Sequence, residues 1–335
     1  MIRLLLIIST FFLFGISSLV AQHSHGEDDA RAAKYCSTNE ALKKLLEDHP
    51  EYAPLIEEAN SDLERFTERF EPQDFQRGGN YIIPVVFHIV HANGDENISD
   101  EQIHDAIDIM TEDFTLQNTD IGTVVSAFES IVANVGVEFR LAKLDPNGNC
   151  TNGIVRVFSG ETFNGGENLK SISPGWPRAN YLNIWVAADL SSGAAGYTYT
   201  PGSVSGIWGA DADGIVIKHT YVGSIGTGSP TRSRALTHEV GHWINLRHPW
   251  GGTNDPGLSE NCNSDDNVSD TPNTRGWTSC SLSGESCGSL DNVQNFMEYS
   301  YCSRMFTEGQ KTRMLAALNS STASRNNLHS LSNLD

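Results

Sequence analysis

One short segment, residues 238–248 (HEVGHWINLRH), constrains this chain more than any other. His238 and His242 are four residues apart, so on a helix they share one face, where two neutral imidazoles can bind one zinc ion. Glu239 lies beside them, where a general base for a zinc-activated water molecule is needed. His248 supplies a third ligand. Three protein ligands leave one coordination position open, which is typical of a catalytic zinc site.

His248 can reach the same ion only if the helix ends soon after His242. A straight helix would carry His248 past the metal, so the chain must turn back sharply. Such a turn favours a residue that tolerates a positive φ, usually Gly and next Asn. Asn245 stands at this point. The alternative is a chance HExxH on an amphipathic helix, and the third histidine at this offset argues against it.

The first 21 residues predict a secretory signal peptide. Arg3 precedes an apolar run that ends in small residues, with cleavage expected near Ala21 and Gln22. An uncleaved anchor is the alternative, but the run is short for a membrane span. The formal charge of −20 argues against a nucleic acid as partner. We therefore expect a secreted protein with no membrane contact after signal cleavage.

Residues 22–79 are charged and helical in pattern, and they predict a helical prosegment. Ser37 and Glu40 can form a capping box for a first helix. A second helix is expected from about Pro54 to Phe70. Arg77, in the polar stretch that follows, is a candidate processing point.

Cys36 lies just before the first of these helices. A prosegment cysteine in a zinc enzyme suggests a thiolate that occupies the open fourth position and excludes water. The alternatives are a disulfide, most simply with Cys150, and a free thiol. On the first interpretation Cys36 is a zymogen switch and the prosegment inhibits its own enzyme.

Residues 80–320 predict one catalytic domain of the α/β (α+β) class, followed by a tail at 321–335. The apolar, β-branched run 81–91 is typical of a buried strand. Ser99 is expected to cap the next helix. Further strands are predicted at these ranges: 135–144, 181–187 and 214–218. Strands and helices in this order favour a twisted, mainly parallel sheet.

The stretch after His248 is polar and glycine-rich, so it needs crosslinks or ions to hold it. Four cysteines allow three pairings, and their spacing does not choose among them: Cys262, Cys280, Cys287 and Cys302. The carboxylates of Asp265, Asp266 and Asp270 could bind calcium, and a solvated loop with Asx turns is the alternative. Thr307 is expected to cap a final helix.

Met297 and Tyr299 complete the candidate site. A buried methionine can form an apolar floor beneath a metal site. Two residues later, Tyr299 could place its phenol near the zinc, where it would stabilise an oxyanion by hydrogen bonding.

Several segments together resemble the pappalysin family of metzincin zinc proteases, in particular its bacterial cytophagalysin-like members. They are HEVGHWINLRHPWGG, the segment 266–272 (DNVSDTP) and the segment 295–300 (NFMEYS). The metzincin pattern is HExxHxxGxxH with a later Met-turn, and Asn245 here replaces the glycine. The strand 83–88 and the Cys36 region are similar too. The resemblance implies a twisted, mixed, five-stranded sheet with backing helices above the cleft, and an irregular disulfide-linked lower subdomain with a C-terminal helix.

The resemblance also implies a secreted zinc metalloendopeptidase made as a latent zymogen, with calcium in the loop after the zinc helix. It implies that the first cysteine of this subdomain pairs with the third and the second with the fourth: Cys262–Cys287 and Cys280–Cys302. It further implies that a glycine-rich strand pairs with the backbone of an extended protein or peptide substrate, whereas the local sequence alone also allows an ordinary edge strand. Its residues are Gly193, Ala194, Ala195, Gly196 and Tyr197.

Two other functions are compatible with a zinc site. One is a zinc-containing binding protein without turnover, and the intact Glu239 argues against it. The other is a zinc hydrolase of non-peptide amides or esters. The glycine-rich strand argues against it, because such a strand favours an extended peptide as substrate. Tyr301 stands before Cys302, where some members of the family carry an acidic residue. A preference for a basic residue after the scissile bond is therefore not implied.

Overall fold

The structure is a computed structural model that describes residues 35–72, 80–206, 209–330 and 333. The expected signal peptide and the candidate processing point Arg77 lie outside these residues. Within the described part of the chain, no helix has the length and apolar character needed to cross a membrane.

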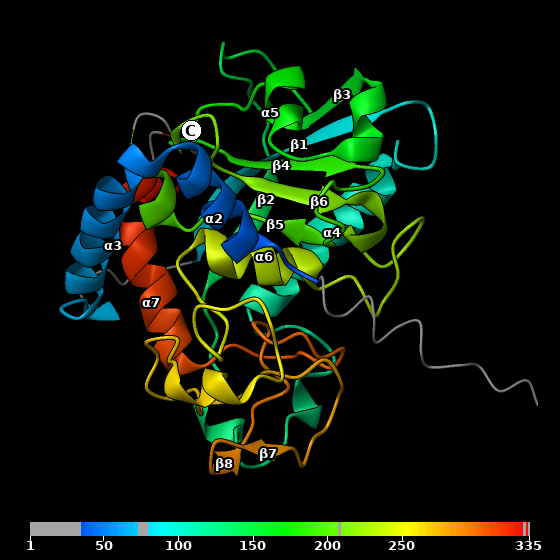
Figure 1. Cartoon of the computed structure of the whole chain (residues 1–335). Coiled ribbons are helices and arrows are strands. Elements are labelled where there is room, and N and C mark those ends of the chain that lie inside the picture. The colour runs from blue at the N-terminus through cyan, green and yellow to red at the C-terminus, as the bar shows by residue number, and fades with distance from the viewer. Residues whose placement is uncertain (1–34, 73–79, 207–208, 331–332, 334–335) are drawn as a thin grey trace, which may run out of the picture.

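A mixed sheet of six strands forms the upper part of the molecule (Figure 1). The strand order is β2-β1-β4-β6-β5, and β3 also pairs with β1. The strands are β1 (Tyr81–His91), β2 (Val137–Leu141), β3 (Ile154–Phe158), β4 (Leu182–Ala187), β5 (Gly196–Tyr197) and β6 (Ile215–Lys218). Neighbouring strands are parallel except β5 and β6, so the predicted mixed, mainly parallel sheet is confirmed. The sixth strand, one more than expected, arises because the long β1 pairs with β2 and then with β3 along the same side.

Both faces of the central strands β4 and β6 are buried, which explains why these strands are apolar at successive positions. In β4, Ile184 and Val186 pack into the core on one face, with helix α4 (Asp100–Phe114) and helix α6 (Ala235–Trp243). Trp185 and Ala187 point to the other face, near the short helix α5 (Asn168–Ile172) and the prosegment. This alternation is the two-residue period of a strand.

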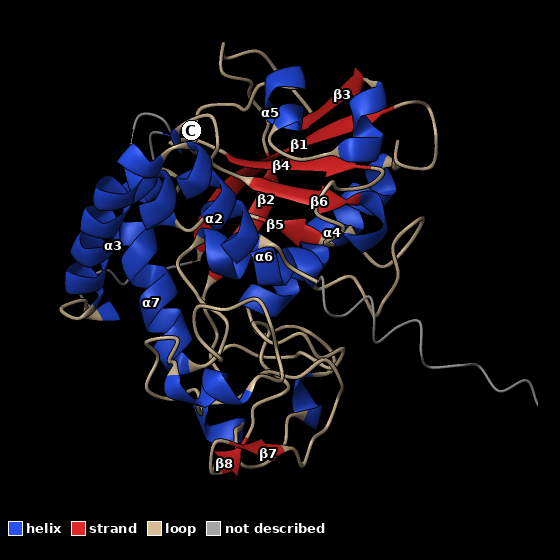
Figure 2. Ribbon diagram, viewed as in Figure 1, coloured by secondary structure: helices blue, strands red, loops and turns tan. Residues whose placement is uncertain are grey.

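Helix α6 lies directly below the sheet and is fixed at its start by buried polar contacts (Figure 2). The Thr237 hydroxyl donates to Asp113 of α4 over 2.7 Å, and Arg234 donates to the same carboxylate over 3.1 Å. The predicted Ser99 cap of α4 is present, because its hydroxyl accepts from the Gln102 N–H at 3.2 Å. These contacts hold α6 against the sheet.

The lower subdomain is mainly loop, as expected. It contains the short strands β7 (Glu285–Ser286) and β8 (Ser289–Leu290), and it ends in helix α7 (Glu308–Asn319). Thr307 and Gln310 form a capping box at the start of α7. The two disulfides are Cys262–Cys287 and Cys280–Cys302, the same pairs that the resemblance implies.

The prosegment region contains two helices, α2 (Thr38–Asp48) and α3 (Ala53–Thr67). Helix α3 lies beside α7 (Figure 1). The predicted capping box at Ser37 is wrong, because the Ser37 side chain makes no cap hydrogen bond and contacts Ser192 instead. Glu40 accepts a hydrogen bond from Asn254 of the catalytic domain, so both side chains serve the contact between prosegment and domain.

Candidate active site

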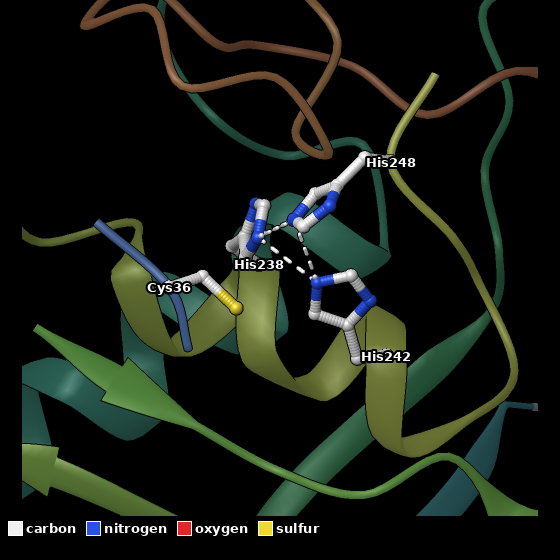
Figure 3. A group of neighbouring side chains, drawn as sticks. All are labelled: Cys36, His238, His242 and His248. Carbon is white, nitrogen blue, oxygen red and sulfur yellow. Dashed lines mark hydrogen bonds between the residues drawn. The ribbon is translucent and has the colours of Figure 1, made fainter. Parts of the chain in front are cut away.

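Three histidine side chains converge beside helix α6 (Figure 3). His238 and His242 come from α6, and His248 comes from the loop that follows it. The Nε2 atom of His242 lies 3.1 Å from that of His238 and 3.1 Å from that of His248. The remaining pair, His238 and His248, is 3.3 Å apart. The structure therefore brings together the three residues predicted as ligands.

Asn245 makes the turn that brings His248 back. Its φ is +83°, in the left-handed region that was expected for this position. The N–H of Leu246 donates to the Gly241 carbonyl at 2.8 Å, which closes the end of α6. Arg313 of α7 donates its Nε to the Asn245 carbonyl at 2.7 Å and holds the turn from below.

The second ring nitrogen of each histidine fixes its tautomer. Nδ1 of His238 lies 2.8 Å from the Phe296 carbonyl, and Nδ1 of His242 lies 2.9 Å from the Leu246 carbonyl. His248 makes a backbone hydrogen bond to Thr253. A carbonyl only accepts, so each ring carries its proton on Nδ1 and presents a lone pair at Nε2.

Three converging lone pairs without a proton between them repel each other unless they share a cation. Their separations of 3.1–3.3 Å match the edge of a tetrahedral zinc site, about 3.3 Å for zinc–nitrogen bonds of about 2.0–2.1 Å. Burial lowers the pKa of His242 to about 4 and those of His238 and His248 well below their ordinary value, so all three rings are neutral. This donor set fits zinc.

Cys36 completes the group from the prosegment side. Its Sγ and the three histidine nitrogens all lie within 4.8 Å of one another, and its side chain is fully buried. Figure 3 shows the sulfur pointing toward the rings from the segment before α2. Cys150 is exposed and free, so the structure does not contain the alternative disulfide. Burial raises the pKa of the Cys36 thiol, so a nearby cation is needed to hold it as a thiolate.

The glycine-rich segment 193–197 forms the edge of the sheet above the histidines. Only Gly196 and Tyr197 are in β5, and Gly193, with φ +73°, is not part of the strand. Residues 35–37 lie along this edge. Ala195 N–H donates to the Tyr35 carbonyl at 3.2 Å, and Ser37 N–H donates to the Gly196 carbonyl at 3.0 Å. The backbone of residues 35–37 therefore occupies the edge that was predicted to bind substrate.

Glu239 lies between this edge and the histidines and is 1% exposed. A Cβ on Gly196 would lie 3.4 Å from the Glu239 side chain, so the strand and the carboxyl are in close approach. Burial raises the pKa of Glu239 to about 8, against hydrogen bonds with Cys36 and Thr38 that lower it. A buried carboxyl with such a pKa can accept and return a proton near neutral pH.

Met297 packs directly under α6. It is fully buried, and its N–H donates to the Asn295 side chain at 2.9 Å, which fixes the turn. Its sulfur faces Gly241, one residue before His242. A Cβ built on Gly241 would lie 2.4 Å from the Met297 sulfur. Met297 therefore has the position of an apolar floor beneath the site.

Replacing Gly241 by alanine should destabilise the protein, because the methyl group and the Met297 sulfur cannot share this space. Overpacking of this kind costs about 1–3 kcal/mol, only partly offset by the better helix propensity of alanine. Denaturant unfolding measures the loss. Gly122→Ala is the control, since nothing lies within 4 Å of the added Cβ there. Equal midpoints for the two variants would show that Met297 is free to move aside.

Tyr299 stands beside the ligands and is 1% exposed. Its ring centroid lies 5.6 Å from that of His238 and 5.0 Å from that of His248. Its hydroxyl donates to Asn254 Oδ1 at 2.5 Å and lies 3.4 Å from the Cys36 carbonyl oxygen. No motif singles out Asn254, so the sequence alone does not reveal it.

The three acidic residues considered for calcium have other partners. Asp265 accepts from the Asn267 N–H, and Asp266 accepts from the Thr271 hydroxyl at 2.8 Å. Asp270 accepts from the Thr307 hydroxyl at 2.6 Å and from the N–H of Gly309 at 2.8 Å, so it caps α7. Among the described residues, the group of Cys, His, Asp and Glu side chains close enough to share a metal ion is the Cys36 and histidine group.

Comparison with known proteins points to one family. A family model described as pregnancy-associated plasma protein-A, a peptidase family, matches residues 167–319. The extracellular metalloprotease 1 of Coccidioides posadasii is 31% identical over 250 residues, which is 69% of this chain and 75% of that protein. An extracellular metalloprotease of Arthroderma otae is 28% identical over 244 residues, 70% of this chain and 77% of that protein.

Solved structures agree with the sequence relatives. A promirolysin variant of Tannerella forsythia has a TM-score of 0.74 and 32% identity, covering 88% of this chain and 97% of its own. Mature mirolysin of Tannerella forsythia in complex with a cleaved peptide has a TM-score of 0.69 and 34% identity. The match covers 77% of this chain and 98% of that chain. With the histidine group and the metzincin-like fold, these matches show that the chain belongs to the pregnancy-associated plasma protein-A (pappalysin) family of zinc metalloendopeptidases.

Proposed function

We propose that this chain is the latent precursor of a secreted zinc metalloendopeptidase, with Cys36 as the switch that keeps it inactive. The observation that carries the proposal is the group of four converging ligand atoms, three from the catalytic domain and one from the prosegment. A fourth protein ligand closes the position that a catalytic zinc site keeps open for water. Loss of the prosegment would reopen it.

In the active enzyme, His238, His242 and His248 hold the zinc ion. Zinc held there would supply Lewis acidity, which polarises a carbonyl group and lowers the pKa of water. Glu239 accepts the proton of the attacking water and passes it to the leaving amine. Tyr299 donates a hydrogen bond to the carbonyl oxygen of the scissile bond as negative charge develops on it.

The substrate in this proposal is an extended protein or peptide that pairs with β5. The free edge of β5 offers the same backbone groups that now bind residues 35–37, at Ala195 and Gly196. We place the prosegment at 22–79, the catalytic domain at 80–320 and the tail at 321–335. The match to promirolysin covers more of this chain, 88%, than the match to mature mirolysin, 77%, which supports a prosegment.

Secretion and calcium complete the proposal. The curated relatives are named extracellular, which supports export through the signal peptide at residues 1–21.

For calcium, the buried Asp266 and its neighbour Asp265 are the best-supported ligands of the three predicted. Burial, and also the charge of Asp265, raise the pKa of Asp266 to about 7, and a bound cation would relieve both effects. Asp270 stays a candidate of lower priority, because both of its oxygens bind the start of α7.

A two-arm cleavage assay tests this function. One arm holds the uncut chain and the other holds the chain cut near Arg77, each with its bound zinc measured and an unstructured protein as substrate. We expect only the cut form to cleave, and a chelator to abolish the cleavage. If both forms bind zinc and neither cleaves, a zinc-containing binding protein becomes the better description.

A second contact, distant from Cys36, also holds the prosegment. It is an ion pair between Glu64 of α3 and Arg313 of α7. Both guanidinium Nη atoms lie 2.8 Å from Glu64 oxygens, and the Arg313 side chain is 3% exposed. Burial raises the pKa of Glu64, but the hydrogen bonds and charge of Arg313 outweigh this and lower it. The same Arg313 supports the Asn245 turn. Helix α3 is therefore coupled to the loop that presents the third ligand.

Glu64→Gln should speed the release of the cut prosegment. The amide keeps the shape of the carboxylate but leaves a buried guanidinium without its counter-ion. We expect on the order of tenfold weaker prosegment binding, which corresponds to about 1.4 kcal/mol. The measurement is the rate at which activity appears after a single cut near Arg77. Glu58→Gln, at an exposed position of α3, is the matched control. If activity appears at the same rate in both variants, then Glu64 does not help to hold the prosegment.

A further inference from the structure

The carbonyl oxygen of Cys36 is bound by two side chains of the catalytic domain. Asn254 donates its Nδ2 to this oxygen, and the Tyr299 hydroxyl lies 3.4 Å from it. The two side chains are also linked, since Tyr299 donates to Asn254 Oδ1 at 2.5 Å. Asn254 is 6% exposed. Asn254 is therefore the buried donor that faces this main-chain carbonyl, and the Tyr299 hydroxyl lies beside it with its proton directed to Asn254 Oδ1.

The segment Tyr35–Ser37 is held from two opposite sides. On one side it pairs with the edge of the sheet, through Ala195 N–H at 3.2 Å and the Gly196 carbonyl at 3.0 Å. In an extended chain, consecutive residues direct their backbone groups to opposite sides. The Cys36 carbonyl therefore points away from the sheet and meets Asn254. These three hydrogen bonds bind only backbone groups of the segment, so another extended backbone could form them.

The loop that carries Asn254 is tied to the metal site as well as to residues 36–40. The residue before it, Thr253, makes a backbone hydrogen bond with His248, and its carbonyl accepts from Trp250 Nε1 at 2.9 Å. The Trp250 ring stacks on the His248 ring, with centroids 4.5 Å apart and planes 5° apart. The loop that carries Asn254 is therefore built on the third ligand, and it is positioned before any substrate binds.

We propose that Asn254 is a substrate-binding residue of the cut enzyme: its Nδ2 donates to a main-chain carbonyl of the extended peptide, and its Oδ1 holds the Tyr299 hydroxyl until that hydroxyl turns to the scissile carbonyl. This inference rests on the proposed function and adds the groups that hold the substrate opposite β5. Release of the prosegment removes the two acceptors of Nδ2, the Cys36 carbonyl and the Glu40 carboxylate, the latter at 2.7 Å. A peptide that covers this amide must offer it an acceptor, because a buried donor without a hydrogen bond is costly.

The test uses the zinc-loaded, cut enzyme with two substitutions of Asn254. Asn254→Leu removes donor and acceptor. Asn254→Asp keeps an acceptor for Tyr299 but faces the peptide carbonyl with a carboxylate. Peptide affinity is measured by fluorescence anisotropy in a Glu239→Ala background, and kcat and KM are measured with Glu239 intact. We expect both substitutions to weaken peptide binding and to lower kcat/KM by about 10- to 100-fold. Asp255→Asn, at the exposed neighbouring position, is the control and should stay within about twofold.

Zinc content and the unfolding midpoint accompany each variant. Peptide affinity within about twofold of the parent for Asn254→Asp would overturn the inference, even if Asn254→Leu were unstable. A loss of affinity that occurs only together with a loss of zinc would also overturn it, because Asn254 would then act on the loop alone. Failure of the proposed function looks different, since in that case the cut parent itself would cleave nothing.

Discussion

Replacing Glu239 by alanine should abolish peptide hydrolysis and leave zinc binding intact. The carboxyl is buried next to the three histidines, but the histidine rings are held by other groups: Nδ1 of His238 contacts the Phe296 carbonyl, Nδ1 of His242 contacts the Leu246 carbonyl, and His248 bonds to the backbone of Thr253. Loss of a general base costs about 10²–10⁴-fold in rate. We expect a loss of at least about 10³-fold in kcat for the cut enzyme. The measurements are peptide turnover and bound zinc per chain.

His242→Ala gives the contrast for this result, because it removes a ligand and should lose both zinc and turnover. The comparison of the two variants separates the role of the Glu239 carboxylate in catalysis from the role of the histidines in zinc binding. Turnover by Glu239→Ala near the parent rate would contradict the role of this residue. Loss of zinc from Glu239→Ala would show that its carboxyl supports the histidines and would leave the base unassigned.

The zinc helix was predictable because its chemistry is local in sequence. The four-residue spacing of His238 and His242 and the left-handed turn at Asn245 follow from backbone geometry alone. The strands β1, β4 and β6 were predictable for a similar reason, since they are apolar and rich in β-branched residues. The order of the strands in the sheet was not predictable, because strands that lie side by side in the sheet are far apart in the sequence.

Contacts between distant segments explain what the sequence did not reveal. Ser37 and Glu40 have the spacing of a capping box, but both side chains bind the catalytic domain, at Ser192 and Asn254. Tertiary contacts outweighed the local preference here. Asn254 lacked any local signal, and its role depends on a loop that folds back over His248. The acidic cluster was ambiguous, because Asx turns, helix caps and ion sites all use the same residues.

Replacing Cys36 by alanine should produce an uncut chain that cleaves peptides. The sulfur is the only prosegment atom in the ligand group of the described residues, so its removal opens the fourth position without any cut. The backbone contacts of residues 35–37 with β5 and Asn254 remain and still obstruct the cleft. We therefore expect partial activation, on the order of 10- to 100-fold over the uncut parent, for a loss of about 1.4–2.8 kcal/mol of prosegment binding.

Cys150→Ala is the matched control, because it removes the other free cysteine of the described chain from an exposed position. It should leave the uncut chain inactive. A chain that carries both Cys36→Ala and Glu239→Ala should cleave no peptide. Any cleavage by this chain would come from a contaminating protease. If the uncut Cys36→Ala chain is as inactive as the parent while its cut form is active, then the backbone grip of residues 35–37 maintains latency and the sulfur does not. Bound zinc per chain is measured as well: the uncut parent and the Cys36→Ala chain should bind equal amounts, since the three histidines suffice to hold the ion when the sulfur is absent.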